Sequence, residues 1–220
     1  MKKSYSLTEE SVAVDECAIP NVWREILQSL IEELERIVKE KMSSLERTAH
    51  SYEHVERVVK IALLLARKEK ADMELVRMAA ILHDVGRCVG QPHNETGAKL
   101  ASEILKNLDY SPQKTKEIAR IILLHNVDSK EKLSSLEEKI VWDADKIDLL
   151  GAVGIARGFH WCGEQSFDSA VKLAFETYSP IYNSLNTRSA RQLAEKRNEE
   201  TMSFLSALKK ELSLADLGIS

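Results

Sequence analysis

Residues 75–86 read LVRMAAILHDVG, an apolar stretch that runs directly into the pair His83-Asp84 and reaches a glycine two residues later. We predict a helix that opens at Asp72, a residue type favoured at helix starts, and ends near Gly86, because glycine is common just beyond a helix. The stretch therefore indicates an apolar helix that delivers an imidazole and a carboxylate, two ligand types for a divalent cation.

The rest of the chain repeats apolar residues at helical spacing on both sides of this stretch. Ser111-Pro112 favours a helix start, and Ser135 with Glu138 forms a capping box, in which each residue satisfies the other's backbone N–H. There is no alternating strand pattern and no internal repeat, so we predict an all-α, compact helical bundle. The predicted helices are 21–42, 51–70, 72–86, 93–108, 111–125, 135–150, a segment around Gly151 and Gly154, 166–178 and 187–212.

The composition is that of one globular domain. The chain has 220 residues, 44% of them hydrophobic and 30% charged, and no linker rich in Gly, Ser or Pro. Residues 1–19 are polar and without clear period, so we expect a loosely packed lead-in followed by a single domain over residues 20–220.

Charge, cysteine content and hydropathy argue against several classes of protein. A net charge of −4 gives no electrostatic reason to expect nucleic acid as a bulk partner. The cysteines Cys17, Cys88 and Cys162 are odd in number and form no CxxC, which argues against a disulfide framework. No signal peptide and no apolar run of membrane-spanning length are found. We expect a cytoplasmic protein that does not enter membranes.

Further candidate ligands lie far from the His83-Asp84 pair in the sequence. His54 lies four residues before Val58 on the inward-facing side of its predicted helix. Asp145 and Asp148 interrupt a strongly apolar helix on one face, and burying a carboxylate is costly unless it is paired or binds a metal. Asp143 points largely elsewhere and is expected to be an ordinary surface acid.

In this order, a His, a His-Asp pair and a distant Asp, the sequence resembles the HD superfamily of metal-dependent phosphohydrolases. The resemblance covers about residues 45–185. The stretch DADKIDLLGAVGIAR at 143–157 is similar to a signature of one bacterial and archaeal branch, some members of which are nucleoside triphosphate pyrophosphohydrolases. The resemblance implies that His54, His83, Asp84 and Asp145 bind the metal.

Two imidazoles and two carboxylates suit Mn²⁺, Fe²⁺, Mg²⁺, Ni²⁺ or Zn²⁺ and do not choose among them. The resemblance implies hydrolysis by an activated water, with Asp84 or Asp148 as the general base. His93 and His125 stand where relatives with two metals place extra histidines, but Asn126 replaces a second histidine there. We therefore expect one divalent ion and keep a second as the alternative.

Phosphate binders should be cationic. The candidates for phosphate, or in the case of the histidines for a second metal, are Arg57, Arg87, His93, His125, Lys146 and Arg157. Arg57 and Lys146 have the strongest claim because they adjoin proposed ligands, whereas a charged residue at random is usually solvated surface. His50 and His160 are expected to be incidental.

The sequence thus predicts a metal-dependent phosphohydrolase acting on a nucleotide or a related phosphate ester or anhydride, with release of pyrophosphate from a nucleoside triphosphate as the most specific form. Three alternatives stay open: a nucleotide phosphomonoesterase or phosphodiesterase, a dinuclear-iron oxygenase, and a non-catalytic nucleotide-binding module. The amphipathic helix over 21–42 packs into the core or faces a second copy in a homodimer, and the core is favoured.

Overall fold

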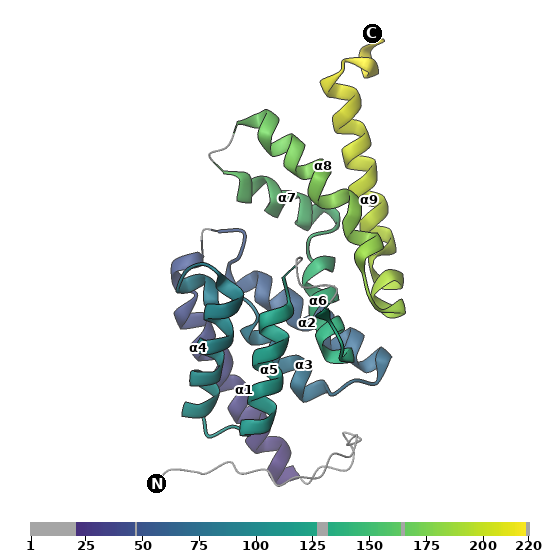
Figure 1. Cartoon of the computed structure of the whole chain (residues 1–220). Coiled ribbons are helices and arrows are strands. Elements are labelled where there is room, and N and C mark those ends of the chain that lie inside the picture. Colours follow the sequence, from purple (N-terminus) through teal and green to yellow (C-terminus); the bar gives the residue numbers. More distant parts are fainter. Residues whose placement is uncertain (1–20, 47, 127–131, 164–165, 219–220) are drawn as a thin grey trace. The chain divides into compact units, whose positions relative to one another are not determined.

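The computed structural model describes residues 21–46, 48–126, 132–163 and 166–218, and the predicted lead-in over 1–19 lies outside them. The described residues form helices and contain no β-strand, so the all-α prediction is confirmed (Figure 1). No helix among them is both long and apolar enough to cross a membrane. The α-helices are α1 Asn21–Lys41, α2 Tyr52–Glu69, α3 Met73–Leu82, α4 His93–Asn107, α5 Pro112–Leu124, α6 Leu136–Ile147, α7 Gly151–Cys162, α8 Phe167–Ser184 and α9 Arg188–Leu212.

The chain divides into two compact units, residues 1–142 and 143–220, which are described separately. In the first unit α4 packs against α5, and α3 packs against α1, α2 and α5 (Figure 1). α3 is apolar nearly all round, and its residues from Leu75 to Leu82, apart from Arg77, are buried. This is the pattern expected of a helix at the centre of a domain. The expectation of a single domain over 20–220 stays a prediction.

Three predicted helix starts are confirmed by their side-chain caps. The side chain of Asp72 accepts a hydrogen bond from the backbone N–H of Leu75, and Ser111 caps α5 in the same way. At the start of α6, Ser135 Oγ accepts from the N–H of Glu138 at 3.1 Å, while the Glu138 carboxylate accepts from the N–H of Ser135 at 3.2 Å. Local sequence chemistry therefore fixes where these helices begin.

Three predicted helix ends are wrong. α3 ends at Leu82 rather than near Gly86, because Asp84 leaves helical backbone angles and a 3₁₀ turn, η2 Val85–Cys88, follows. α6 ends at Ile147 rather than Leu150, ahead of Gly151, which has a φ of +77°. α8 runs to Ser184, past the predicted end at 178, with Pro180 inside it.

Gly86 explains how η2 and α4 approach so closely. A Cβ at this position would overlap the carbonyl oxygen of His93 and the backbone of Gly97, so only glycine fits. The contact fixes the start of α4 against the turn that carries Asp84. Two segments of the predicted metal site are thereby joined through their backbones.

The second unit is held together around α9, which packs against α7 and α8. Tyr178 of α8 donates a hydrogen bond to the carbonyl of Gly154 in α7 at 2.8 Å. Asp143 is fully buried and accepts four hydrogen bonds, from the backbone N–H and side chain of both Asn186 and Thr187. The expectation that Asp143 is a surface acid is wrong, since it fixes the turn between α8 and α9.

Candidate metal centre

Asp84 is the centre of a cluster of histidines in the first unit. Its carboxylate is buried, with 1% of the residue exposed, at the junction of α3 and η2. Imidazoles from the turn before α2, from α2, from the end of α3, from the start of α4 and from the end of α5 surround it. They belong to His50, His54, His83, His93 and His125.

One oxygen of Asp84, Oδ2, faces the first pair of imidazoles. It lies 3.7 Å from Nε2 of His54 and 3.8 Å from Nε2 of His83. These two Nε2 atoms are themselves 3.3 Å apart. Three of the four predicted ligands therefore meet within one unit of the protein.

The other oxygen, Oδ1, faces a second pair. It lies 3.7 Å from Nε2 of His93 and 3.5 Å from Nε2 of His125, and the two nitrogens are 3.2 Å apart. Nε of Arg87 forms an ion pair with the same oxygen at 2.7 Å. Within the described part of the chain no donor is aligned well enough to give Oδ1 a hydrogen bond.

Two of the imidazoles have their tautomer fixed by the backbone. Nδ1 of His83 donates to the carbonyl of Ala80 at 2.8 Å, and Nδ1 of His125 donates to the carbonyl of Ile122 at 2.5 Å. In the neutral ring the proton on Nδ1 leaves a lone pair on Nε2. Each ring therefore presents an electron pair toward its partner histidine, the orientation found in metal-ligating histidines.

These residues fit a divalent metal ion. Donors held roughly 2.1 Å from one cation lie about 3.0–3.4 Å from each other, near the separations within each group. Imidazole nitrogens as close as those of His54 and His83 repel unless one carries a proton or a cation lies between them. The buried, electron-rich group of His54 and His83, with Oδ2 of Asp84 beside it, is therefore suited to hold a cation.

The titration behaviour favours the forms that bind metals. Burial alone would raise the pKa of Asp84, but the surrounding imidazoles of His83, His125 and His50 and the guanidinium of Arg87 hold that pKa well below its ordinary value. Burial, together with the charge of Arg87, lowers the pKa of His93 to about 4. At neutral pH the carboxylate is ionised and the His93 ring is neutral, as ligands must be.

The remaining predicted carboxylates belong to the second unit. Asp145 lies in α6, with Oδ2 at 2.6 Å from Nζ of Lys146, and its role as fourth ligand stays a prediction. Asp148 follows the end of α6 and is fully buried, and its Oδ2 is 2.7 Å from Nη1 of Arg157. The role of Asp148 as a general base also stays a prediction.

The proposed phosphate binders are largely engaged with acids. Arg87, Lys146 and Arg157 each form an ion pair with a predicted site carboxylate, namely Asp84, Asp145 and Asp148 in turn. Arg57 is half-buried on α2, three residues after His54. A phosphate group would have to share the three paired cations with their acids.

The expectation that His50 is incidental is wrong, because its Nδ1 lies 3.0 Å from Oδ2 of Asp84. The residue precedes Ser51, the first residue of the predicted helix, so helical periodicity did not include it. The signal that would have found it is the spacing of four residues to His54, which places two imidazoles near each other at a helix start.

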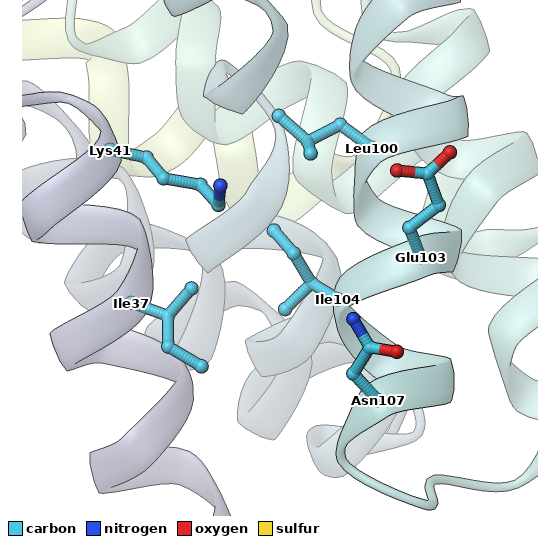
Figure 2. Close-up of a pocket in the computed structure, with 6 residues that line it drawn as sticks. All are labelled: Ile37, Lys41, Leu100, Glu103, Ile104 and Asn107. Carbon is cyan, nitrogen blue, oxygen red and sulfur yellow. The ribbon is translucent and has the colours of Figure 1, made fainter.

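A pocket on the first unit is separate from this cluster. It is lined from α1 by Ile37 and Lys41 and from α4 by Leu100, Glu103, Ile104 and Asn107 (Figure 2). Three of its lining side chains are apolar, and the other three carry an amine, a carboxylate and an amide. It contains none of the imidazoles and no predicted site residue, so it is not the candidate metal centre.

Comparison with known proteins identifies the family. The HD domain family matches residues 51–150, which include His54, His83, Asp84, His93, His125 and Asp145. The uncharacterized protein YpgQ of Bacillus subtilis is 31% identical over 180 residues, 76% of this chain and 86% of YpgQ. The chain belongs to the HD superfamily.

Solved structures show the same fold. The crystal structure of Bacillus subtilis YpgQ in complex with ADP matches with a TM-score of 0.70 and 26% identity, covering 84% of this chain and 96% of YpgQ. An HD-superfamily hydrolase from Bacillus thuringiensis matches with a TM-score of 0.68 and 30% identity, covering 84% of this chain and 98% of the hydrolase. The relatives thus include a protein described as a hydrolase.

Proposed function

We propose that the protein is a metal-dependent phosphohydrolase that acts on a nucleotide or a related phosphate ester or anhydride. The observation that carries the proposal is the arrangement of two facing imidazole pairs about the two oxygens of buried Asp84. A bound divalent cation supplies Lewis acidity there: it offsets the negative charge of a phosphoryl group and makes a nearby water more acidic.

We propose that His54, His83 and Asp84 hold this cation and that Asp145 completes the set. The distances of 3.3–3.8 Å among the first three donors support their part. The support for Asp145 is the family order of ligands, and its Asp145→Asn variant should lower the affinity for Mn²⁺. Nitrogen and oxygen donors of this kind accept Mn²⁺, Fe²⁺, Mg²⁺, Ni²⁺ or Zn²⁺.

The proposal keeps one resident ion, with a second as the alternative. The alternative has its own support, because Asp84, His93 and His125 form a buried group whose donor atoms lie within 4.8 Å of one another. In that case Asp84, His93 and His125 would hold the second ion. Metal content per chain, measured for the wild type and for His125→Ala, separates one ion from two.

The most specific form of the proposal is cleavage of a nucleoside triphosphate to a monophosphate and pyrophosphate. A water oxygen bonds to the α-phosphorus, the bond from that phosphorus to the bridging oxygen breaks, and pyrophosphate leaves. Asp84 or Asp148 takes the proton of the water. The resemblance of residues 143–157 and the binding of ADP by YpgQ support a nucleotide substrate.

The test is turnover of a nucleotide panel by protein stripped of metal and reloaded with each candidate ion. We expect pyrophosphate and a monophosphate, with activity lost in His54→Ala and kept in the exposed control His160→Ala. Orthophosphate or a linear monophosphate would favour the phosphomonoesterase or phosphodiesterase. Oxygen consumption by a two-iron form would favour the oxygenase. Tight nucleotide binding without turnover by metal-loaded protein would favour the binding module.

A further inference from the structure

The six groups around Asp84 fall into two sets by distance. His50 Nδ1 and Arg87 Nε lie 3.0 Å and 2.7 Å from the carboxylate, within reach of a direct polar contact. The four other imidazoles lie farther away, at 3.5–3.8 Å, which are separations suitable for donors that share a cation with the carboxylate. We therefore assign different roles to the close set and the distant set.

The ring atoms that face Asp84 separate the same two sets. A carboxylate oxygen accepts hydrogen bonds, so the Nδ1–H group of His50 donates one to Oδ2 at 3.0 Å. The four distant imidazoles face Asp84 with Nε2 instead, and in His83 and His125 that nitrogen bears the lone pair. His50 is thus a donor to the carboxylate, whereas the rings of His83 and His125 are built as donors to a metal.

We infer that His50 and Arg87 are positioning residues for the carboxylate of Asp84, with His50 in contact with Oδ2 and Arg87 in contact with Oδ1. In this orientation Oδ2 faces the His54–His83 pair, and Oδ1 faces the His93–His125 pair. The inference rests on the proposed metal site. The torsion that turns a carboxylate about its own axis has broad minima, so side-chain packing alone does not fix its plane. The hydrogen bond from His50 to Oδ2 and the ion pair of Arg87 with Oδ1 restrict the orientation of that plane.

The positioning residues are themselves held in place. His50 lies in the turn before α2, where its backbone N–H donates to Oγ1 of Thr48 at 3.2 Å, and 17% of its side chain is exposed. Arg87 is part of η2, with 16% of its side chain exposed. Groups that orient a metal ligand in this way contribute about 10- to 100-fold to metal affinity in other proteins.

The test compares an isosteric donor with a truncation. In His50→Asn the amide nitrogen occupies the same place along the side chain as Nδ1 and can donate to Oδ2, whereas His50→Ala leaves no donor. Mn²⁺ affinity is measured by titration, and the visible spectrum of the Co²⁺ form reports ligand geometry. We expect Mn²⁺ affinity about 10- to 100-fold weaker in His50→Ala, affinity within about threefold of wild type in His50→Asn, and no change in His160→Asn.

Arg87 is tested in the same series. Arg87→Gln should weaken Mn²⁺ binding, and the exposed control Arg67→Gln should not. Thermal unfolding of the metal-free variants separates a general loss of structure from a loss of orientation. If His50→Ala does not fold, His50→Gln replaces it: its nitrogen lies one bond further out, so it should bind Mn²⁺ more weakly than His50→Asn.

The outcomes distinguish this inference from the proposed function. If wild type binds Mn²⁺ and His50→Asn loses as much affinity as His50→Ala, His50 is a ligand and the positioning role is wrong. If His50→Ala binds Mn²⁺ as wild type does, the positioning role is also wrong while the metal site stands. A wild-type protein that binds none of the candidate ions would overturn both.

Discussion

Asp84 and Asp143 are both buried carboxylates, yet their surroundings differ in kind. Each oxygen of Asp143 accepts two hydrogen bonds, and the four donors come from Asn186 and Thr187 at 2.8–2.9 Å. Asp84 lies among imidazoles, and its Oδ1 meets Nε of Arg87 as an ion pair at 2.7 Å, without an aligned hydrogen-bond donor in the described residues. A buried acid whose hydrogen bonds are complete serves the fold, whereas one that faces nitrogen lone pairs is arranged to hold a cation.

The largest expected effect tests the functional side of this comparison. Asp84→Asn removes the charge between the imidazole pairs, so phosphohydrolase activity should fall by about 1000-fold, the scale of losing a group that acts in the transition state. Metal binding should no longer raise the Tm, whereas the wild type gains stability from Mn²⁺. The checks are steady-state turnover and thermal unfolding with and without Mn²⁺; a Tm gain equal to that of wild type would contradict the metal site.

Asp143→Asn tests the structural side. An amide nitrogen would replace one acceptor and face the donors of residues 186 and 187, so the free energy of unfolding should fall by about 3 kcal/mol. Urea denaturation measures the loss. The folded fraction should keep its Mn²⁺ affinity, and a variant that loses affinity for Mn²⁺ without losing stability would reverse the roles assigned to the two acids.

The backbone contact beside Asp84 is the next test. Gly86→Ala places a Cβ against the carbonyl of His93 and the backbone of Gly97, so we expect about 2 kcal/mol of destabilisation and weaker Mn²⁺ binding. Gly97→Ala is the graded control, because its nearest contacts are 3.3 Å away. Equal effects of the two substitutions in urea denaturation would show that the close approach is not what joins η2 to α4.

The smallest expected effect is a pH dependence of the metal-free protein. The pKa of His93 falls from 6.5 to about 4 on folding, mainly through burial, so the unfolded chain binds more protons between these values. Lowering the pH from 7 to 5 should therefore reduce the free energy of unfolding by about 1–2 kcal/mol. Urea denaturation at both pH values measures it. His93→Asn should weaken the dependence of the unfolding free energy on pH. An unchanged dependence in that variant would show that other groups cause it.

The sequence predicted most of the helices and the superfamily, because these depend on local patterns and on the order of a few residues. Asp72, Ser111 and the Ser135–Glu138 pair cap the helices that they were expected to start. The HD superfamily was predicted from the order of His54, His83-Asp84 and Asp145. Helix caps involve residues a few positions apart, and the family motif is an order of residues along the chain, so both can be read from the sequence.

What the sequence did not predict depends on contacts between distant segments. The role of His50 requires knowing that the turn before α2 meets the end of α3, 34 residues later. The burial of Asp143 depends on a turn 43 residues further on. The end of α3 at Leu82 follows from the backbone angles of Asp84, which its residue type does not dictate.

His83 and His125 each donate Nδ1–H to the carbonyl three residues earlier, in the last turn of their own helices. Helix ends leave such carbonyls without an intrahelical partner, so one bond caps the helix and also chooses the tautomer. Because each ring and its carbonyl partner are only three residues apart, the tautomer is selected without a tertiary contact. Exchange of one metal for another, or a substitution elsewhere in the cluster, changes what these rings meet but not which nitrogen they offer.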